Sequence, residues 1–163
     1  MLPDAECVKI VIEILRDVGV GDFRVVINHR KILDGIFELC GVPPEKFRTI
    51  CSSIDKLDKT FWDDVRAEMI DEKGVSPEIA DAIGTHIQLS GKPTDVIATL
   101  KAKEDFMSNS NARSGLESVE LMFKYCELMG IDSSLLIFNL SLARGLDYYT
   151  GVIFEAILIR KSS

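Results

Sequence analysis

Apolar side chains recur at helical spacing over most of the chain. In residues 4–18 they stand three or four positions apart, which places them on one face of a helix. The same spacing runs through residues 30–40 and 111–129, and through short segments between 44 and 103. Glycine or proline separates these segments, as is typical of helix ends. The pattern therefore predicts a series of amphipathic helices whose apolar faces pack together.

Three other segments carry strand patterns. Residues 23–28 place Phe23, Val25 and Ile27 on one face of a short strand. Residues 137–142 alternate apolar and polar positions, and residues 152–159 are β-branched and apolar enough for a buried strand. The polar residues 104–112 predict a loop. The order is helix, strand, helix, helical region, helix and two strands. This order predicts an α+β fold in which helices cover one side of a mainly antiparallel sheet.

Two interruptions divide this pattern into parts. A double proline at 43–44 disfavours helix just before it, and a polar run ends near residue 110. From residue 44 to about residue 103 the sequence pattern is helical. We therefore predict two segments of a sheet-containing core, at 1–42 and 111–163, and an all-helical insertion subdomain at 43–110.

Composition excludes several classes of protein. The chain has 163 residues, of which 47% are hydrophobic, so it can bury a core. No apolar run approaches the ~20 residues of a membrane span, and the first residues lack the basic and apolar regions of a signal peptide. The net charge of −7 argues against a non-specific nucleic-acid binder. We expect no membrane association, and any contact with nucleic acid must be confined to a local basic patch.

The cysteines and histidines give no sign of a metal site. The four cysteines show neither close pairing nor metal-ligand spacing, and the two histidines are far apart in the sequence. Reduced cysteines suit a cytoplasmic protein. We therefore expect no protein-bound metal.

Residues 144–151 concentrate polar chemistry between two apolar strands. Arginine offers a planar fork of donors that suits a carboxylate or a phosphate. Tyrosine offers an aromatic wall and a hydroxyl that donates or accepts, which suits an imidazole or an amide. The segment therefore predicts a site for a small, planar ligand with an anionic end. Its candidate residues are Arg144, Gly145, Asp147, Tyr148, Tyr149 and Gly151.

A purely structural interpretation of the same residues stays open. The tyrosines would then be sheet residues with hydrated hydroxyls, and Arg144 with Asp147 an ordinary surface ion pair. Adjacent strand residues point to opposite faces, so Tyr148 and Tyr149 share one wall only if the strand bulges beside its flanking glycines. His29, at the end of a predicted strand, is interpreted as structural and not as catalytic.

The order of residues favours the functional interpretation. The string Arg-Gly-Leu-Asp-Tyr-Tyr-Thr-Gly at 144–151 resembles the histidine-binding signature of histidyl-tRNA synthetases, which are class II aminoacyl-tRNA synthetases. Residues 4–6 and 28–35 resemble segments of the same family that follow its second class-defining motif. Residues 51–59 resemble the helical insertion of its eukaryotic members. The resemblance runs in family order from about 4 to 158.

The resemblance implies a cytoplasmic, homodimeric ligase, with a mitochondrial form left open. Such an enzyme activates histidine with ATP and Mg²⁺ and transfers it to tRNA(His), with the insertion near the acceptor stem. It implies that Arg144 is the catalytic residue, at the α-phosphate, and also borders the histidine site. Tyr149 would hydrogen-bond the imidazole, and Tyr148 would line the same pocket. Three further residues would shape the site: Gly145, Asp147 and Gly151.

Several family features have no counterpart in the chain. These are the three class-defining motifs, which supply the dimer interface and the ATP-binding arginines, a glycine-rich segment and the anticodon-binding domain. We therefore expect a fragment that is inactive alone, from a parent that dimerises through segments absent here. Two other functions stay open. One is a synthetase-like regulatory protein that senses histidine or uncharged tRNA, and the other is a helical interaction module at 44–130.

Overall fold

A computed structural model describes residues 1–145 and 148–159. Three helices of ten or more residues belong to the parts of the chain that flank the predicted insertion: α1 (Leu2–Val18), α2 (Arg30–Leu39) and α8 (Ser110–Leu128). The helices between them are α3 (Phe47–Ile54), α4 (Trp62–Asp71), α5 (Pro77–Ile87), α6 (Pro93–Lys101) and α7 (Glu104–Ser108). Short 3-10 helices are η1 (Pro44–Lys46), η2 (Asp55–Asp58) and η3 (Ser133–Leu135). The strands are β1 (Phe23–His29), β2 (Ser90–Gly91), β3 (Leu136–Asn139) and β4 (Val152–Leu158).

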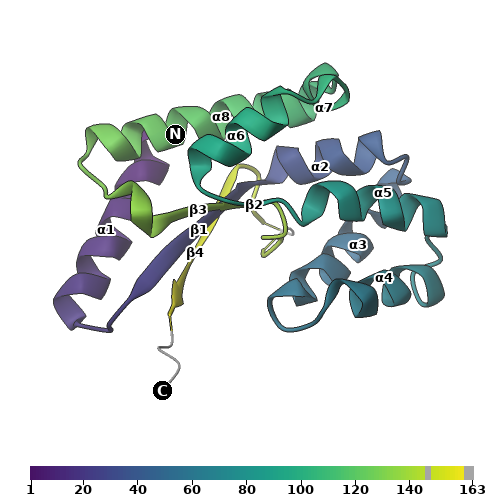
Figure 1. The fold of residues 1–163 in the computed structure, drawn as a ribbon, viewed down its shortest axis with the longest axis horizontal. Coiled ribbons are helices and arrows are strands. Elements are labelled where there is room, and N and C mark those ends of the chain that lie inside the picture. The colour runs from purple at the N-terminus through teal and green to yellow at the C-terminus, as the bar shows by residue number, and fades with distance from the viewer. Residues whose placement is uncertain (146–147, 160–163) are drawn as a thin grey trace.

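The strands form one sheet in the order β2-β3-β1-β4. β1 pairs antiparallel with β4 over its whole length, from Phe23 opposite Leu158 to His29 opposite Val152. β1 pairs parallel with β3, and β2 pairs antiparallel with β3. Two of the three pairings are antiparallel, and the helices segregate from the sheet (Figure 1). The predicted α+β fold with a mainly antiparallel sheet is therefore confirmed.

Helices α1 and α8 cover one face of the sheet (Figure 1). Alternate side chains of β1 point to that face, because successive strand residues point to opposite sides. They form a buried cluster with apolar residues of the two helices: Ala5, Val8, Ile12, Val25, Ile27, Met122 and Cys126. The other side chains of β1, among them Val26 and Asn28, lie on the opposite face, and this face carries the site described below.

A second hydrophobic cluster joins α2, α8 and the helices between them. α2 and α8 pack so closely that a Cβ atom on Gly35 would lie 2.5 Å from the backbone nitrogen of Ala112. The cluster includes residues from all three predicted segments, 1–42, 43–110 and 111–163. The division into these segments stays a prediction, since the core is continuous across both boundaries.

The structure corrects three local predictions. The predicted loop at 104–112 is wrong, because it contains α7 and the first turn of α8. Phe106 is fully buried and anchors α7, and Asn109 caps α8 by accepting a 2.9 Å hydrogen bond from the Ala112 nitrogen. The strand predicted at 137–142 ends at Asn139, and β2 was not predicted. None of the described helices is long and apolar enough to span a membrane.

Candidate functional site

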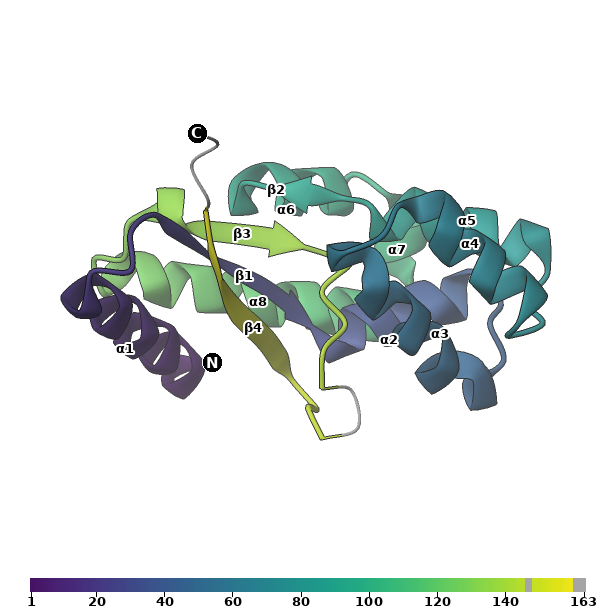
Figure 2. The ribbon, with the colours of Figure 1, turned by 90° about the horizontal axis from the view of Figure 1, so that it is seen from below.

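The segment between β3 and β4 lies at the end of the sheet where β1 runs into α2 (Figure 2). Asn28, at the end of β1, is fully buried and donates hydrogen bonds to the Leu140 oxygen at 3.1 Å and the Leu142 oxygen at 3.0 Å. The Arg30 nitrogen donates to the Gly151 oxygen at 2.8 Å. Both ends of the segment are therefore anchored to the junction of β1 and α2.

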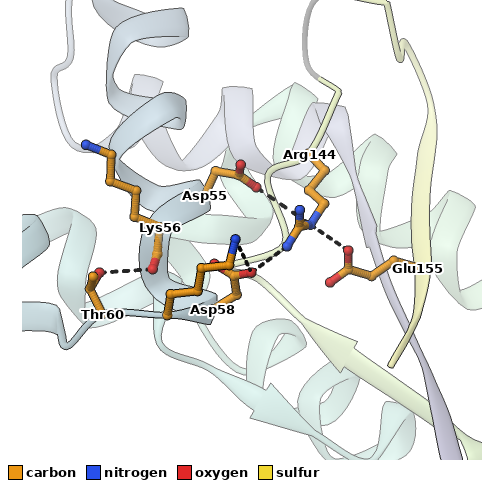
Figure 3. A network of polar contacts seen from close by, with 7 residues as sticks. Asp55, Lys56, Asp58, Thr60, Arg144 and Glu155 are labelled. Carbon is orange, nitrogen blue, oxygen red and sulfur yellow. Dashed lines mark hydrogen bonds and ion pairs between the residues drawn. The ribbon is translucent and has the colours of Figure 1, made fainter. Parts of the chain in front are cut away.

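Arg144 projects from this segment into a group of carboxylates (Figure 3). Its Nε atom lies 2.5 Å from Oε2 of Glu155 on β4, and its Nη2 atom lies 2.5 Å from Oδ2 of Asp58. Asp55 is more distant, with Oδ1 3.9 Å from the Nε atom. Asp55 and Asp58 belong to η2, so the arginine bridges the sheet and the helical region that follows α2.

The electrostatics of this group keep Arg144 charged. Burial disfavours the charged form, yet the carboxylates of Glu155, Asp55 and Asp58 outweigh it and raise the pKa of Arg144 above its ordinary value. The arginine side chain is still 40% exposed, so its donors face the solvent as well as the protein. A permanently charged, accessible guanidinium is suited to bind an anion.

A cleft of about 520 Å³ opens beside Arg144. Its size falls within the range of about 300–1,000 Å³ that is usual for small-molecule sites. Val26 and Leu142 give it apolar walls, and Asn139 and Ser141 add polar groups that bond to each other at 2.8 Å. Its other lining residues, among those described, are Asp55, Leu57, Asp58, Arg144, Glu155, Ala156 and Ile157. Three of these described lining residues are carboxylates and Arg144 is the one cation among them, so the anionic end of a ligand would have to bind at Arg144.

Gly145 determines how the two tyrosines lie. Its φ angle of 66° is in the left-handed region, and its oxygen accepts from the nitrogens of Tyr148 at 3.1 Å and Tyr149 at 2.9 Å. The tyrosine rings lie side by side with centroids 4.8 Å apart. A Cβ on Gly145 would lie 2.5 Å from the Tyr149 ring and 2.9 Å from the Tyr148 ring. The backbone angle therefore favours glycine here, and a side chain at this position would also displace the two tyrosine rings.

The site differs from its prediction in two respects. The tyrosines lie on a loop and not on a strand, so strand alternation does not apply to them and the rings of Tyr148 and Tyr149 lie side by side without a strand bulge. Of the candidate residues Arg144 lines the cleft, whereas Gly145, Tyr148, Tyr149 and Gly151 are outside its lining residues. Asp147 lies outside the described residues.

Sequence reasoning missed the residues that hold the loop and its arginine. Asn28 is a polar residue at the end of an otherwise apolar run, and this break was the available signal for its role. Its Oδ1 atom is buried without a partner among the described residues. Asp58 gave no such signal, because alternating charges in its neighbourhood are typical of a solvated helix end.

The family model described as histidyl-tRNA synthetase matches residues 1–160. The chain belongs to the histidyl-tRNA synthetase family. The resemblance inferred from the residues at 144–151 is thereby confirmed at the level of the family.

Individual relatives agree with this assignment. A cytoplasmic histidine–tRNA ligase of Mesocricetus auratus is 51% identical over 160 residues, which are 98% of this chain and 31% of that protein. A mitochondrial histidine–tRNA ligase of Homo sapiens gives the same identity and coverage. The crystal structure of histidyl-tRNA synthetase from Nostoc sp. PCC 7120 matches 96% of this chain and 36% of that chain, with a TM-score of 0.89 and 30% identity. The chain thus spans about a third of these relatives.

His29 has a structural role in this histidyl-tRNA synthetase segment. Its Nδ1 atom accepts a 3.1 Å hydrogen bond from the Lys31 nitrogen and so caps the N-terminus of α2. Only 3% of the residue is exposed. Burial, assisted by the positive charge of Lys31, lowers the pKa of His29 to about 4. The structural interpretation of His29 therefore agrees with the geometry.

The lowered pKa predicts that acid destabilises the fold. Below about pH 6.5 the unfolded chain binds a proton at His29, whereas the folded chain binds it only near pH 4. Stability is therefore full above pH 6.5 and falls as the pH decreases toward 4. We expect His29 to contribute a loss of about 2 kcal/mol in the free energy of unfolding between pH 7 and pH 5, measured by urea titration.

His29→Asn is the matched variant for this prediction. Asparagine can accept the capping hydrogen bond but does not titrate, and His86, whose pKa burial also lowers, remains in both proteins. The variant should lose about 2 kcal/mol less than the wild type over the same pH interval. An equal loss in both proteins would contradict the assignment.

Proposed function

We propose that this chain supplies the histidine-binding part of a histidine–tRNA ligase. Such an enzyme activates histidine with ATP to form histidyl-adenylate and then transfers histidine to tRNA(His). The family assignment and the string at 144–151 support the proposal. The observation that carries it is the position of Arg144, a charged and accessible guanidinium at the wall of a cleft of ligand size.

Arg144 is proposed as the catalytic residue. ATP enters as its Mg²⁺ complex, and the histidine carboxylate attacks the α-phosphate. Negative charge grows on the phosphate oxygens in the transition state, and a guanidinium placed there stabilises it without any proton transfer. Its planar fork of donors also suits the histidine carboxylate, which carries the charge before the attack.

The tyrosines are proposed to recognise the histidine side chain. The Tyr149 hydroxyl would hydrogen-bond the imidazole, and Tyr148, whose ring lies beside it, would line the same pocket, which would extend beyond the cleft lined by Arg144. An amino acid without an imidazole would leave these polar groups unpaired, which is how such a site rejects it. We assign Gly145, Asp147 and Gly151 to shaping the loop.

The complete activity is proposed to need more than these 163 residues. The chain spans 31% of the length of its hamster and human relatives, so the dimer interface and the remaining ATP contacts would come from other segments. We propose a homodimeric protein whose isolated 163-residue part does not charge tRNA. We place it in the cytoplasm, a reducing compartment that suits its free cysteines, although one relative bears a mitochondrial name.

Removal of the Tyr149 hydroxyl tests the proposed recognition of imidazole. In a complete synthetase that carries this segment, Tyr149→Phe should raise the KM for histidine about 3- to 10-fold, the value of one lost hydrogen bond, and change kcat less. ATP–pyrophosphate exchange at varied histidine concentration measures both constants. Tyr125→Phe, which removes a hydroxyl on α8, is the control. An unchanged KM in the Tyr149 variant would exclude the proposed contact.

A further inference from the structure

The contacts of Arg144 come from two parts of the molecule. Glu155 stands on β4, where it is opposite Val26 in a pairing that extends over seven residues. Asp58 stands at the end of η2, a 3-10 helix of four residues. Both carboxylates lie 2.5 Å from the guanidinium, so distance alone does not distinguish their roles. Their surroundings do.

Glu155 is held more firmly than Asp58. β1 and β4 share an uninterrupted antiparallel ladder, which fixes the backbone of Glu155. The Glu155 side chain is 28% exposed and that of Asp58 is 34% exposed. Asp58 also has a second cation within reach, because Nζ of Lys59 lies 3.9 Å from its Oδ2 atom. Asp58 can therefore leave the arginine and keep a counter-ion, whereas Glu155 stays with the sheet.

The nitrogen atoms of Arg144 that the two carboxylates contact also distinguish Glu155 from Asp58. A guanidinium binds an anion bidentately through one of two edges, Nε with Nη2 or Nη1 with Nη2. Nη2 contributes one N–H group to each edge, and Asp58 accepts from this nitrogen. An anionic ligand bound at Nη2 would therefore lie beside the Asp58 carboxylate, and the repulsion between the two negative charges makes them compete for the guanidinium. Glu155 contacts Nε and leaves the second edge to the ligand.

We propose that Glu155 is a positioning residue that holds Arg144 toward the cleft, and that Asp58 occupies the anion-binding atom of Arg144 until an anionic ligand displaces it. The inference rests on the proposed function, because it concerns Arg144, the residue proposed to bind the anionic groups of the substrates. It adds that η2 and the bound anion compete for one guanidinium. Binding of the anion therefore releases η2 from the loop that bears Arg144.

The positioning role is tested without ligand or catalysis. In the ¹⁵N-labelled 163-residue chain, the Nε–H group of Arg144 should give a slowly exchanging NMR signal, because Glu155 accepts its hydrogen bond. Glu155→Ala should lose this signal, Glu155→Gln should retain part of it, and Asp58→Asn should leave it in place. Glu120→Gln, which removes a surface carboxylate paired with Lys101, is the control. A persistent signal in Glu155→Ala would overturn the positioning role.

The competition is tested with inorganic pyrophosphate as the anion. Asp58→Asn should lower its Kd about threefold, the scale of one exposed ion pair. Asp55→Asn removes the same charge from the same 3-10 helix, but Asp55 lies 3.9 Å from Nε and does not contact Nη2, so the gain should be smaller. Equal gains in both variants, or no gain in Asp58→Asn, would overturn the proposal.

A kinetic measurement separates this inference from the proposed function. In a complete synthetase that carries this segment, Glu155→Ala should lower kcat for histidine-dependent exchange about 10-fold with little change in the KM for histidine, and Glu155→Gln should recover part of the loss. A wild-type synthetase without histidine-dependent exchange would refute the proposed function. The NMR and pyrophosphate results on the 163-residue chain would still decide the roles of Glu155 and Asp58.

Discussion

Arg144→Ala should lower kcat for histidine-dependent ATP–pyrophosphate exchange about 100- to 1,000-fold in a complete synthetase that carries these residues. Loss of one preorganised donor to the charge that grows in a transition state has effects of this size. The carboxylates around Arg144 make the change more severe, because Asp55, Asp58 and Glu155 would remain beside the phosphate without their cation.

Arg66→Ala is the matched control for this prediction. Arg66 on α4 also pairs with a carboxylate, Asp81 on α5, and its side chain is 35% exposed, close to the 40% of Arg144. It does not line the cleft. We expect kcat of the Arg66→Ala variant to stay within about twofold of the wild type, because surface ion pairs contribute little to the stability of the fold. A loss of less than tenfold in Arg144→Ala would remove the catalytic role from Arg144.

Gly35→Ala should destabilise the fold by about 2 kcal/mol and lower Tm by roughly 4–8 °C. The added Cβ would lie 2.5 Å from the nitrogen of Ala112 and 2.8 Å from its Cα atom, so it meets the backbone of α8 and not a flexible side chain. Separating α2 from α8 would open the core that joins the helical region to the sheet. The strain exceeds the gain in helix propensity that alanine usually brings.

Gly91→Ala provides the comparison for Gly35. A Cβ on Gly91 would meet only Val96, at an ordinary distance of 3.7 Å. Its unfolding free energy should stay within about 0.5 kcal/mol of the wild type. Thermal or urea unfolding measures the stability of both variants. Equal stability of the two would contradict the close packing of α2 against α8.

Local patterns predicted the long elements well. The apolar spacing of residues 4–18 corresponds to α1 (Leu2–Val18), and that of 111–129 to α8 (Ser110–Leu128). One face of a helix is formed by residues three or four positions apart, so the pattern can be found in a short stretch of sequence. β2 escaped prediction because its two residues are a strand only by pairing with Phe138 and Asn139, which are distant in the sequence. α7 escaped because the burial of Phe106 outweighs its polar neighbours.

The site was predictable in its chemistry but not in its contacts. The residues at 144–151 indicated an anion-binding arginine and an aromatic wall, and the family resemblance implied that their ligand is histidine. No local pattern could show that Asp58, 86 positions away, bonds to Arg144. Nor could strand alternation show that the rings of Tyr148 and Tyr149 lie together, because both residues follow Gly145 on a loop, where φ of the glycine is 66°.

ATP–pyrophosphate exchange with each of the twenty amino acids, in a complete synthetase that carries this segment, tests the proposed function most directly. We expect exchange with histidine alone, since only histidine offers an imidazole to Tyr149 together with a carboxylate to Arg144. Exchange with no amino acid would contradict catalysis and would favour a protein that senses histidine or uncharged tRNA. Exchange with an amino acid other than histidine would contradict the proposed pocket.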